Sequence, residues 1–308
     1  TLVNDFLTDS PDIFNNQTTK EILVLENIRF YPQEKQNDPA FTKRLSALAD
    51  VYVNDAFAMA HRTESSVVGV PGILPAYGGL LLKKELKMIS QVVQNPKKPV
   101  VIILGGSKIS SKINLISKLL TIGDYLLIGG GIANTFLAAQ NIEVGESIYE
   151  YDEKENARRL MYEASQRGTQ ILLPTDAICG NKDDIDSPGT VKKVGDVLRT
   201  DSILDIGPMT QTAWGEVIEQ ANTIIWNGPV GYFENAEYRM GTDFIYSAIT
   251  HNDHCMSVVG GGDTLTAISK KEYIEKITHI STGGGAMLEF IEKGTLPGIE
   301  ALQLKHDS

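Results

Sequence analysis

Beyond Pro99 the chain alternates between short apolar runs and longer segments whose apolar residues recur at helical spacing. The apolar runs cover residues 100–104, 125–128, 170–173, 202–206, 223–226, 257–259 and 278–280. Helical patterns lie between them, for example at residues 153–166, 210–220 and 241–249. Strands that are apolar throughout and alternate with helices predict a parallel, doubly wound α/β sheet.

The first hundred residues carry a shorter version of this alternation. Two predicted strands and a further apolar run cover residues 21–25, 51–53 and 67–70. Asp38 and Pro39 are typical of a helix start, as N-cap and first helical residue. A long helical pattern at residues 77–94, closed by Asn95 and Pro96, separates the two strand-rich blocks. This helix is therefore predicted to connect two domains.

The strands of the second block end at glycine-rich turns, and in a doubly wound sheet such ends meet at the edge where ligands bind. The turns are Gly105-Gly106-Ser107-Lys108, Gly129-Gly130-Gly131, Asp205-Ile206-Gly207-Pro208, Trp226-Asn227-Gly228-Pro229, Gly260-Gly261-Gly262-Asp263 and Gly283-Gly284-Gly285. A single turn of this kind indicates little, because most glycines in α/β loops only form turns. Five or six on one edge predict a binding site.

Residues 256–289 contain two copies of one local device, in which an apolar run stops at three glycines and a helical pattern follows. The N–H groups and dipole at a helix start attract anions. Asp263, directly after one glycine run, adds a carboxylate. Beside phosphates a carboxylate is useful when a hard cation such as Mg²⁺ lies between them. The pattern predicts a Mg-nucleotide site.

Lys108 and Lys112 are four residues apart at a predicted helix start, so we expect both side chains on one helix face near the anion. A lone pair at this spacing is more often two surface lysines, but the preceding strand and Gly-Gly turn favour a ligand. The glycine of a Walker A loop, the protein-kinase motifs and the G-x-G-x-x-G dinucleotide fingerprint are all missing. A dinucleotide oxidoreductase is therefore disfavoured.

Other candidates have plain structural alternatives. Glu234 suits a ribose hydroxyl pair or a solvated surface position. Arg29 and Arg62 follow predicted strands and could grip a carboxylate or phosphate, or be surface arginines. The cluster at residues 251–255, with His251, His254 and their neighbours Asp253 and Cys255, resembles a metal site but lacks a second ligand pair, so a structural metal is disfavoured.

Composition narrows the class of protein. The chain has 308 residues and a net charge of −11, so nucleic acid is an unfavourable partner and an anionic ligand needs local positive charge. Cys179 and Cys255 provide no disulfide framework. The N-terminal residues lack a signal-peptide pattern, and no apolar run reaches the ~18–20 residues of a membrane span. We expect a soluble, intracellular protein.

Several motifs together resemble the phosphoglycerate kinase family. They are LENIRFYPQE, YVNDAFAMAHR, GGSKISSK, GGGIANTFL, LPTD, DIGPMT, WNGPVGYFE, GGGDT and STGGGAMLE, in this order from about Glu21 to Leu302. The resemblance implies two Rossmann-like parallel-sheet domains joined by a long helix. It also implies reversible phosphoryl transfer between ATP and 3-phosphoglycerate, or in reverse between 1,3-bisphosphoglycerate and ADP. The enzyme would be a cytoplasmic, hinge-bending monomer that takes Mg²⁺ with its nucleotide.

The resemblance divides the chain into a 3-phosphoglycerate domain at residues 1–76, a helix at 77–95, a nucleotide domain at 96–290 and a tail at 291–308 that returns to the first domain. The tail would begin near Pro297 and Gly298. The first domain is expected to be incomplete, because the family's Asp-x-Asn pair, catalytic arginine and His-x-Gly-Arg loop are not found. A non-catalytic nucleotide-binding fragment or interaction module therefore remains an alternative to an active kinase.

Site residues follow from the resemblance by position. Catalytic roles would fall to Lys108, Lys112, Gly283, Gly284 and Gly285. Nucleotide would be bound by Lys112, Gly106, Gly129, Gly130, Asn227, Pro229, Glu234, Gly261, Gly262, Asp263 and Thr264, with Mg²⁺ on Asp263. Arg29 and Arg62 would bind 3-phosphoglycerate. Asn134 and Met287 depart from the expected pattern and are predicted to tune the pocket.

Overall fold

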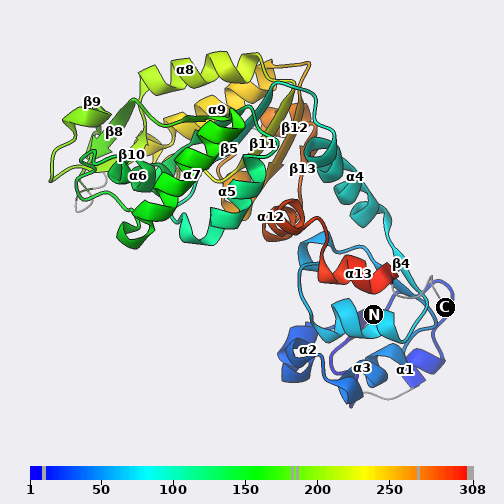
Figure 1. Cartoon of the computed structure of the whole chain (residues 1–308). Helices are drawn as coiled ribbons and strands as arrows, with labels where there is room; N and C mark the ends of the chain where they lie inside the picture. The colour runs from blue at the N-terminus through cyan, green and yellow to red at the C-terminus, as the bar shows by residue number, and fades with distance from the viewer. Residues whose placement is uncertain (9–11, 182–183, 185–186, 269–270, 304–308) are drawn as a thin grey trace. The chain divides into compact units, whose positions relative to one another are not determined.

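The computed structural model describes residues 1–8, 12–181, 184, 187–268 and 271–303 of the chain (Figure 1). It contains two compact units. Unit 1 comprises Thr1–Lys84 and Lys293–Ser308, and unit 2 comprises Glu85–Glu292. Helix α4 (Leu80–Gln94) begins in unit 1 and ends in unit 2. Residues 304–308 of the predicted C-terminal tail lie outside the described residues.

Unit 1 is built from short elements. They are β1 (Leu2–Val3), α1 (Asp12–Asn15), β2 (Val24–Leu25), η1 (Ile28–Phe30), α2 (Pro32–Gln36), α3 (Pro39–Ser46), β3 (Tyr52–Asn54), η2 (Phe57–Met59), η3 (Ser65–Gly69), η4 (Val70–Gly72), β4 (Ala76–Gly78) and α13 (Pro297–Gln303). The predicted start of α3 is confirmed, because the Asp38 side chain accepts a hydrogen bond from the Phe41 N–H. Helix α13 is tied to the unit by a hydrogen bond from Gly298 N to Ala60 O.

Two expectations for unit 1 need correction, and one apolar run receives its assignment. The strand predicted at residues 21–25 is reduced to Val24–Leu25, with Val24 55% exposed. The apolar run at 67–70, to which the sequence assigned no element, belongs to the helical turns η3 and η4. There Val67 and Val70 are buried three residues apart, which is helical spacing. The long helix starts at Leu80 rather than 77, because residues 76–78 pair with β3 as a parallel strand.

Unit 2 has a parallel sheet of six strands among the described residues, in the order β13-β12-β11-β5-β6-β7. The strands are β5 (Val100–Leu104), β6 (Tyr125–Ile128), β7 (Gln170–Leu172), β11 (Thr223–Asn227), β12 (Met256–Gly260) and β13 (His279–Ile280). The predicted strands are thus confirmed at these positions. Because β5 leads outward to β6 and β11 leads outward to β12, the order reverses between β5 and β11, where open α/β sheets bind ligands.

Helices cover both faces of this sheet (Figure 1). The helices of unit 2 are α5 (Ile113–Leu119), α6 (Gly130–Ala139), α7 (Lys154–Arg167), α8 (Pro208–Glu219), α9 (Met240–His251), α10 (Gly262–Thr266), α11 (Lys271–Lys276) and α12 (Gly284–Lys293), with the short turns η5 (Ser110–Lys112), η6 (Tyr151–Glu153), η7 (Val194–Asp196) and η8 (Ala236–Tyr238). The three predicted helices correspond to α7, α8 and α9. Residue Gly168, with φ of 77°, ends α7 in the left-handed conformation.

The run at 202–206 is a strand but does not join the parallel sheet. As β10 (Ser202–Ile206) it pairs antiparallel with β8 (Asp176–Gly180), which also pairs antiparallel with β9 (Thr190–Lys193). The parallel assignment was therefore wrong for this strand. Strand period alone identifies an extended segment but not its partner, and neither β8 nor β9 is an uninterrupted apolar run.

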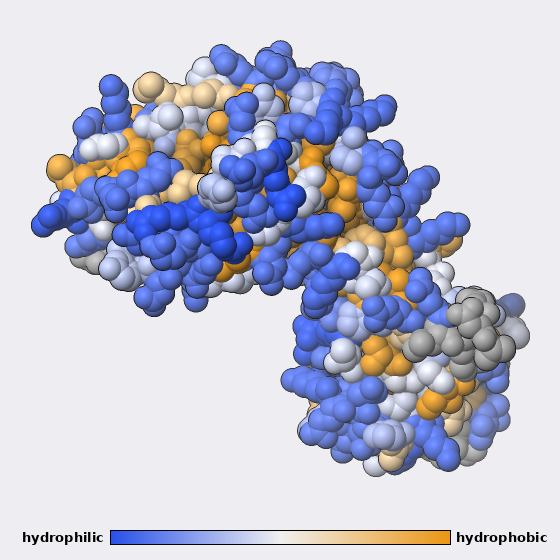
Figure 2. Space-filling model, in the orientation of Figure 1, coloured by the Kyte–Doolittle hydropathy of each residue, from blue (hydrophilic) through white to orange (hydrophobic). Residues whose placement is uncertain are grey.

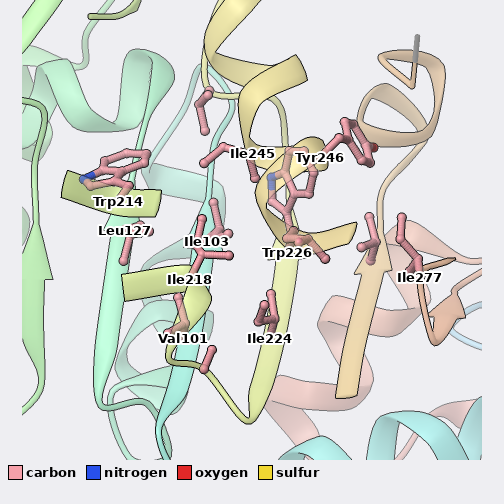
Figure 3. Close-up of a cluster of buried hydrophobic side chains, with 14 of the residues drawn as sticks. Val101, Ile103, Leu127, Trp214, Ile218, Ile224, Trp226, Ile245, Tyr246 and Ile277 are labelled. Carbon is pink, nitrogen blue, oxygen red and sulfur yellow. The ribbon is translucent and has the colours of Figure 1, made fainter. Parts of the chain in front are cut away.

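The core of unit 2 lies between the sheet and helices α8 and α9. Figure 3 shows Trp226 of β11 beside Tyr246 of α9, with ring centroids 4.2 Å apart. Trp214 and Ile218 of α8 pack against the same cluster. Full burial of one large side chain stabilises a fold by roughly 1.5–3 kcal/mol, so this cluster fixes the sheet that carries the strand ends.

Hydrophilic residues cover most of the face shown in Figure 2, in both units. Within the described residues, no helix is long and apolar enough to span a bilayer.

Candidate nucleotide and anion sites

A cavity of about 540 Å³ opens at the carboxyl edge of the sheet in unit 2. Its wall comes from the turns after β5 and β11, from strand β10 itself and from the first turns of α6. Five residues that the sequence assigned to nucleotide line it, namely Gly106, Gly130, Pro229, Glu234 and Asp263. Glu234 and Asp263 are exposed, so their carboxylates face solvent at this cavity.

The glycine turns around the cavity are bonded to one another. Gly106 N donates to Pro229 O over 3.1 Å, and Gly130 N donates to Val230 O over 3.0 Å. Gly129 N donates to Leu104 O over 2.9 Å. These amides are used within the protein, so the turns supply a rigid wall rather than free N–H donors at these points.

Two glycines are required by close backbone approach. A Cβ atom at Gly105 would lie 1.9 Å from the Pro229 carbonyl oxygen. At Gly228, where φ is 90°, a Cβ atom would lie 2.4 Å from the Gly105 oxygen. The turns after β5 and β11 therefore touch through their main chains.

The expectation that Lys108 and Lys112 share a helix face is wrong. Helix α5 begins only at Ile113, and Lys112 ends the preceding 3-10 turn η5. Lys108 lies before this turn and is exposed. The Ser110 amide and hydroxyl both bond to the Glu150 carboxylate, at 2.8 and 2.6 Å. The Glu150 carboxylate thus anchors the start of η5 rather than the start of α5.

Lys112 points instead into the strand ends. Its Nζ donates to Gly105 O over 2.9 Å and to Asn227 Oδ1 over 3.0 Å. Asn227 in turn donates from Nδ2 to Gly260 O over 2.7 Å. Burial lowers the pKa of Lys112 to about 8, although the nearby Asp263 carboxylate opposes this effect. The ammonium is therefore still mainly protonated at neutral pH and available to an anion.

The two glycine turns that precede α10 and α12 lie against each other. A Cβ atom at Gly284, the first residue of α12, would lie 2.5 Å from Gly261 Cα, directly before α10. The first N–H groups of a helix have no intrahelical acceptor. Gly283 differs, because its N–H already donates to Ser281 Oγ over 3.3 Å. The amides of Gly284 and Gly285 are those that a helix start leaves available to a ligand.

Thr264 and Asn227 are largely committed to the protein. Thr264 is fully buried, and its hydroxyl accepts from Gly228 N and donates to Gly260 O, at 2.8 and 3.0 Å. Asn227 is 5% exposed. Both side chains hold the turns after β11 and β12 together, and their contact with nucleotide stays a prediction.

In unit 1, Arg29 and Arg62 are brought together by an acid that the sequence analysis did not single out. Glu64 Oε1 lies 3.4 Å from Arg29 Nη2 and 3.4 Å from Arg62 Nη1. Arg29 and Glu64 line a cavity of about 380 Å³ that lies within this unit. The two arginines thus form one positively charged cluster with a buried counterion.

Two further residues of unit 2 received no individual role in the sequence analysis. Asp205, in the cavity wall, is 1% exposed, and burial raises its pKa to about 7 against hydrogen bonds from Gly241 N and Ile206 N. Glu85 of α4 is fully buried and accepts from the Thr282 amide and hydroxyl, while His279 Nε2 lies 2.7 Å from its other oxygen. The sequence signal that could have identified these two residues is a carboxylate within an otherwise apolar strand or helix face.

Comparison with known proteins gives one consistent result. A family model described as phosphoglycerate kinase matches residues 1–294. A phosphoglycerate kinase of Dictyoglomus turgidum is 46% identical over 291 residues, which cover 94% of this chain and 74% of that protein. One from Legionella pneumophila (strain Corby) is 48% identical over 284 residues, covering 92% of this chain and 72% of the relative.

Solved structures agree with these relatives. The structure of phosphoglycerate kinase from Coxiella burnetii matches with a TM-score of 0.88 and 39% identity, covering 99% of this chain and 77% of that one. The crystal structure of the enzyme from Pyrococcus horikoshii matches with a TM-score of 0.86 and 30% identity, covering 99% and 78%.

Proposed function

Because this chain belongs to the phosphoglycerate kinase family, the glycolytic phosphotransferases, we propose that unit 2 binds Mg-nucleotide and that unit 1 binds 3-phosphoglycerate. The reaction is the reversible transfer of a phosphoryl group between ATP and the acid, or between 1,3-bisphosphoglycerate and ADP. A direct in-line transfer needs little covalent work from the protein, so positioning and charge stabilisation dominate.

The observation that carries the nucleotide assignment is the 540 Å³ cavity with five sequence-predicted residues in its wall. Its volume suits a ligand of nucleotide size. Gly106, Gly129, Gly130 and Pro229 would flank the base, and Glu234 at the exposed edge would accept from the ribose hydroxyls.

The phosphates would extend toward Lys112 and the starts of α10 and α12. Lys112 supplies a charge at the junction of three strand ends, and Gly261, Gly262, Gly284 and Gly285 present the backbone of two converging helix starts. Lys108 and Gly283 complete the proposed catalytic set around the group in transfer. Donors placed where charge develops typically contribute 10²–10³ in rate each.

Asp263 is the proposed magnesium ligand. It is exposed at the cavity and lies close enough to Lys112 to affect its pKa. In the described part of the chain, no group of three or more His, Cys, Asp or Glu side chains is placed to hold a metal. A single carboxylate at a phosphate site fits Mg²⁺, which commonly binds through one or two carboxylates, waters and substrate phosphates. The bound ion would neutralise phosphate charge.

The acid site is proposed at Arg29 and Arg62, whose guanidinium groups suit the phosphate and carboxylate of 3-phosphoglycerate. The proposal retains the division into a 3-phosphoglycerate domain, a connecting helix, a nucleotide domain and a C-terminal tail, with the helix corrected to α4 (Leu80–Gln94). It also includes a cytoplasmic monomer and hinge bending, since direct transfer requires the acid and the nucleotide to meet.

The decisive experiment is a spectrophotometric assay with ATP, Mg²⁺ and 3-phosphoglycerate coupled to NADH oxidation, with MgADP calorimetry on the same sample. We expect turnover and nucleotide binding. Binding without turnover would favour the non-catalytic nucleotide-binding module, and absence of both would contradict the proposal.

The magnesium assignment has its own test. Asp263→Ala should make ADP affinity independent of Mg²⁺, whereas Asp253→Ala, a change of the same charge outside the cavity, should leave the dependence intact. A retained Mg²⁺ dependence in Asp263→Ala would remove Asp263 as the metal ligand.

A further inference from the structure

Glu64 lies between the two arginines of unit 1 and is the deepest member of the cluster. One oxygen, Oε1, contacts both guanidinium groups at 3.4 Å. The Glu64 side chain is 9% exposed, whereas those of Arg29 and Arg62 are 36% and 35% exposed. The carboxylate therefore sits behind the guanidinium groups, which remain accessible from solvent.

Separate backbone turns hold the three side chains in place. Arg29 lies in η1, where its N–H donates to the Asn27 side chain over 3.1 Å. Arg62 follows η2, and its N–H donates to Met59 O over 3.0 Å. Glu64 is the N-cap residue directly before η3, and its carbonyl accepts from Val67 N and Val68 N. The contact is thus built into the local folds of three segments.

The charges of the cluster do not cancel, because two guanidinium groups share one carboxylate. Among the described residues, the buried atoms Arg29 Nε, Arg62 Nε and Glu64 Oε2 have no hydrogen-bond partner. Buried polar atoms are normally paired, so the cluster is under-satisfied as it stands. It retains capacity for one more anion.

The other buried acid beside this cavity, Glu34, forms no ion pair with either arginine in the described structure, although the charges of Glu64 and Arg29 act on its pKa. Glu34 is fully buried, and its carboxylate accepts from the amide and hydroxyl of Ser66. Glu64 is therefore the carboxylate that directly contacts the guanidinium groups an incoming anion would need.

We propose that Glu64 is an internal counterion that competes with the anionic groups of the acid substrate for Arg29 and Arg62, and so limits the affinity of this site. The inference rests on the proposed function, which assigns the two arginines to 3-phosphoglycerate. Like charges a few ångströms apart repel appreciably even near solvent, so removing the Glu64 charge should tighten anion binding roughly tenfold.

The test is calorimetric titration of the protein and its Glu64→Gln variant with 3-phosphoglycerate and, separately, with inorganic phosphate. Glu64→Gln keeps the shape but removes the charge. We expect roughly tenfold tighter binding, a correspondingly lower KM for 3-phosphoglycerate, and a steeper weakening of binding with added KCl.

Two variants separate charge from contact. Glu64→Asp keeps the charge but shortens the side chain, and its affinity should fall between the wild type and Glu64→Gln. Glu26→Gln is the matched control, because Glu26 lines the same cavity but forms no ion pair with either arginine in the described structure. Its anion affinity should change less than twofold.

Unchanged or weaker binding by folded Glu64→Gln would overturn the proposal and make Glu64 an orienting residue only. If Glu64→Gln does not fold, wild-type affinity in Glu64→Asp would overturn it. Arg29→Ala and Arg62→Ala test the underlying assignment separately. If both bind 3-phosphoglycerate as the wild type does, the arginine assignment fails, whatever the Glu64 variants show.

Discussion

Lys112 Nζ donates a hydrogen bond to Asn227 Oδ1 over 3.0 Å, although 115 residues separate them along the chain. The bond joins the turn after β5 to the end of β11, at the point where the strand order reverses. Asn227 Nδ2 in turn donates a hydrogen bond to the Gly260 carbonyl at the end of β12. One ammonium group thus links the two strand ends that flank the proposed phosphate site.

Lys112→Met should reduce kcat by roughly 10²–10³, because it removes the positive charge at this junction while keeping a side chain of similar length. Far-ultraviolet circular dichroism should remain that of the wild type. Lys118→Met, on the exposed side of α5, is the matched control and should keep wild-type kcat. Wild-type kcat in folded Lys112→Met would remove Lys112 from the catalytic set.

The pH dependence should carry the signature of the same ammonium. Burial lowers the pKa of Lys112 to about 8, so the charged form predominates below pH 8 and is lost as the pH rises through that value. The parameter kcat/KM reports groups of the free enzyme and should therefore fall on the alkaline side of pH 8. In Lys112→Arg this alkaline limb should disappear, since a guanidinium stays protonated. A limb unchanged in Lys112→Arg would assign it to another group.

Glu85→Gln should destabilise unit 2 by about 1–3 kcal/mol, measured by urea unfolding. The change leaves one acceptor for three donors around a fully buried position, namely the two of Thr282 and the His279 ring. Burial alone would raise the pKa of Glu85, but hydrogen bonds from His279 and Thr282 bring it below its ordinary value of 4.5. A lowered carboxyl pKa stabilises the fold above the unfolded value, so the contribution is present above about pH 4.5 and fades on further acidification. Equal urea unfolding midpoints for the wild type and Glu85→Gln at pH 7 would contradict this account.

Gly284→Ala should cost about 1–3 kcal/mol of stability, because the added methyl group would lie 2.5 Å from Gly261 Cα. Gly285→Ala supplies the comparison, since no atom lies within 4 Å of a Cβ there and alanine favours the helix. Thermal unfolding of the two variants should separate them clearly, with Gly285→Ala at or above the wild-type Tm. A similar loss in both would mean that helix-start geometry, rather than contact with Gly261, is responsible.

The sequence predicts the parallel strands of unit 2 well for a physical reason. Strands such as 100–104 are buried on both faces, so their apolar runs are unbroken and stand out from the helices between them. This apolar pattern can be recognised in the segment alone, without knowing which strands lie beside it. Residues 202–206 have a similar pattern, interrupted by Asp205, but their pairing with β8 depends on a segment elsewhere in the chain.

The glycine turns were predictable because a run of glycines after a strand has few structural explanations. The interaction partners of the charged residues were not predictable from the sequence. Glu64 has an ordinary local sequence, and Glu85 and Asp205 differ only in being acids within an apolar helix face or strand. Their roles come from arginines, a histidine or amides that the fold brings to them. The sequence identified Lys112 as a candidate because it follows a strand and a Gly-Gly turn. The direction of its side chain, however, depends on where α5 begins.

The contact between the turns after β5 and β11 also constrains how this sequence can change. A side chain at either Gly105 or Gly228 would occupy space that the other turn already fills with backbone. Neither position can be enlarged unless the other segment withdraws, and withdrawal would move Pro229 or Asn227 away from the strand ends. In a directed-evolution library, viable variants should therefore keep glycine at both positions, although the two codons are far apart in the gene.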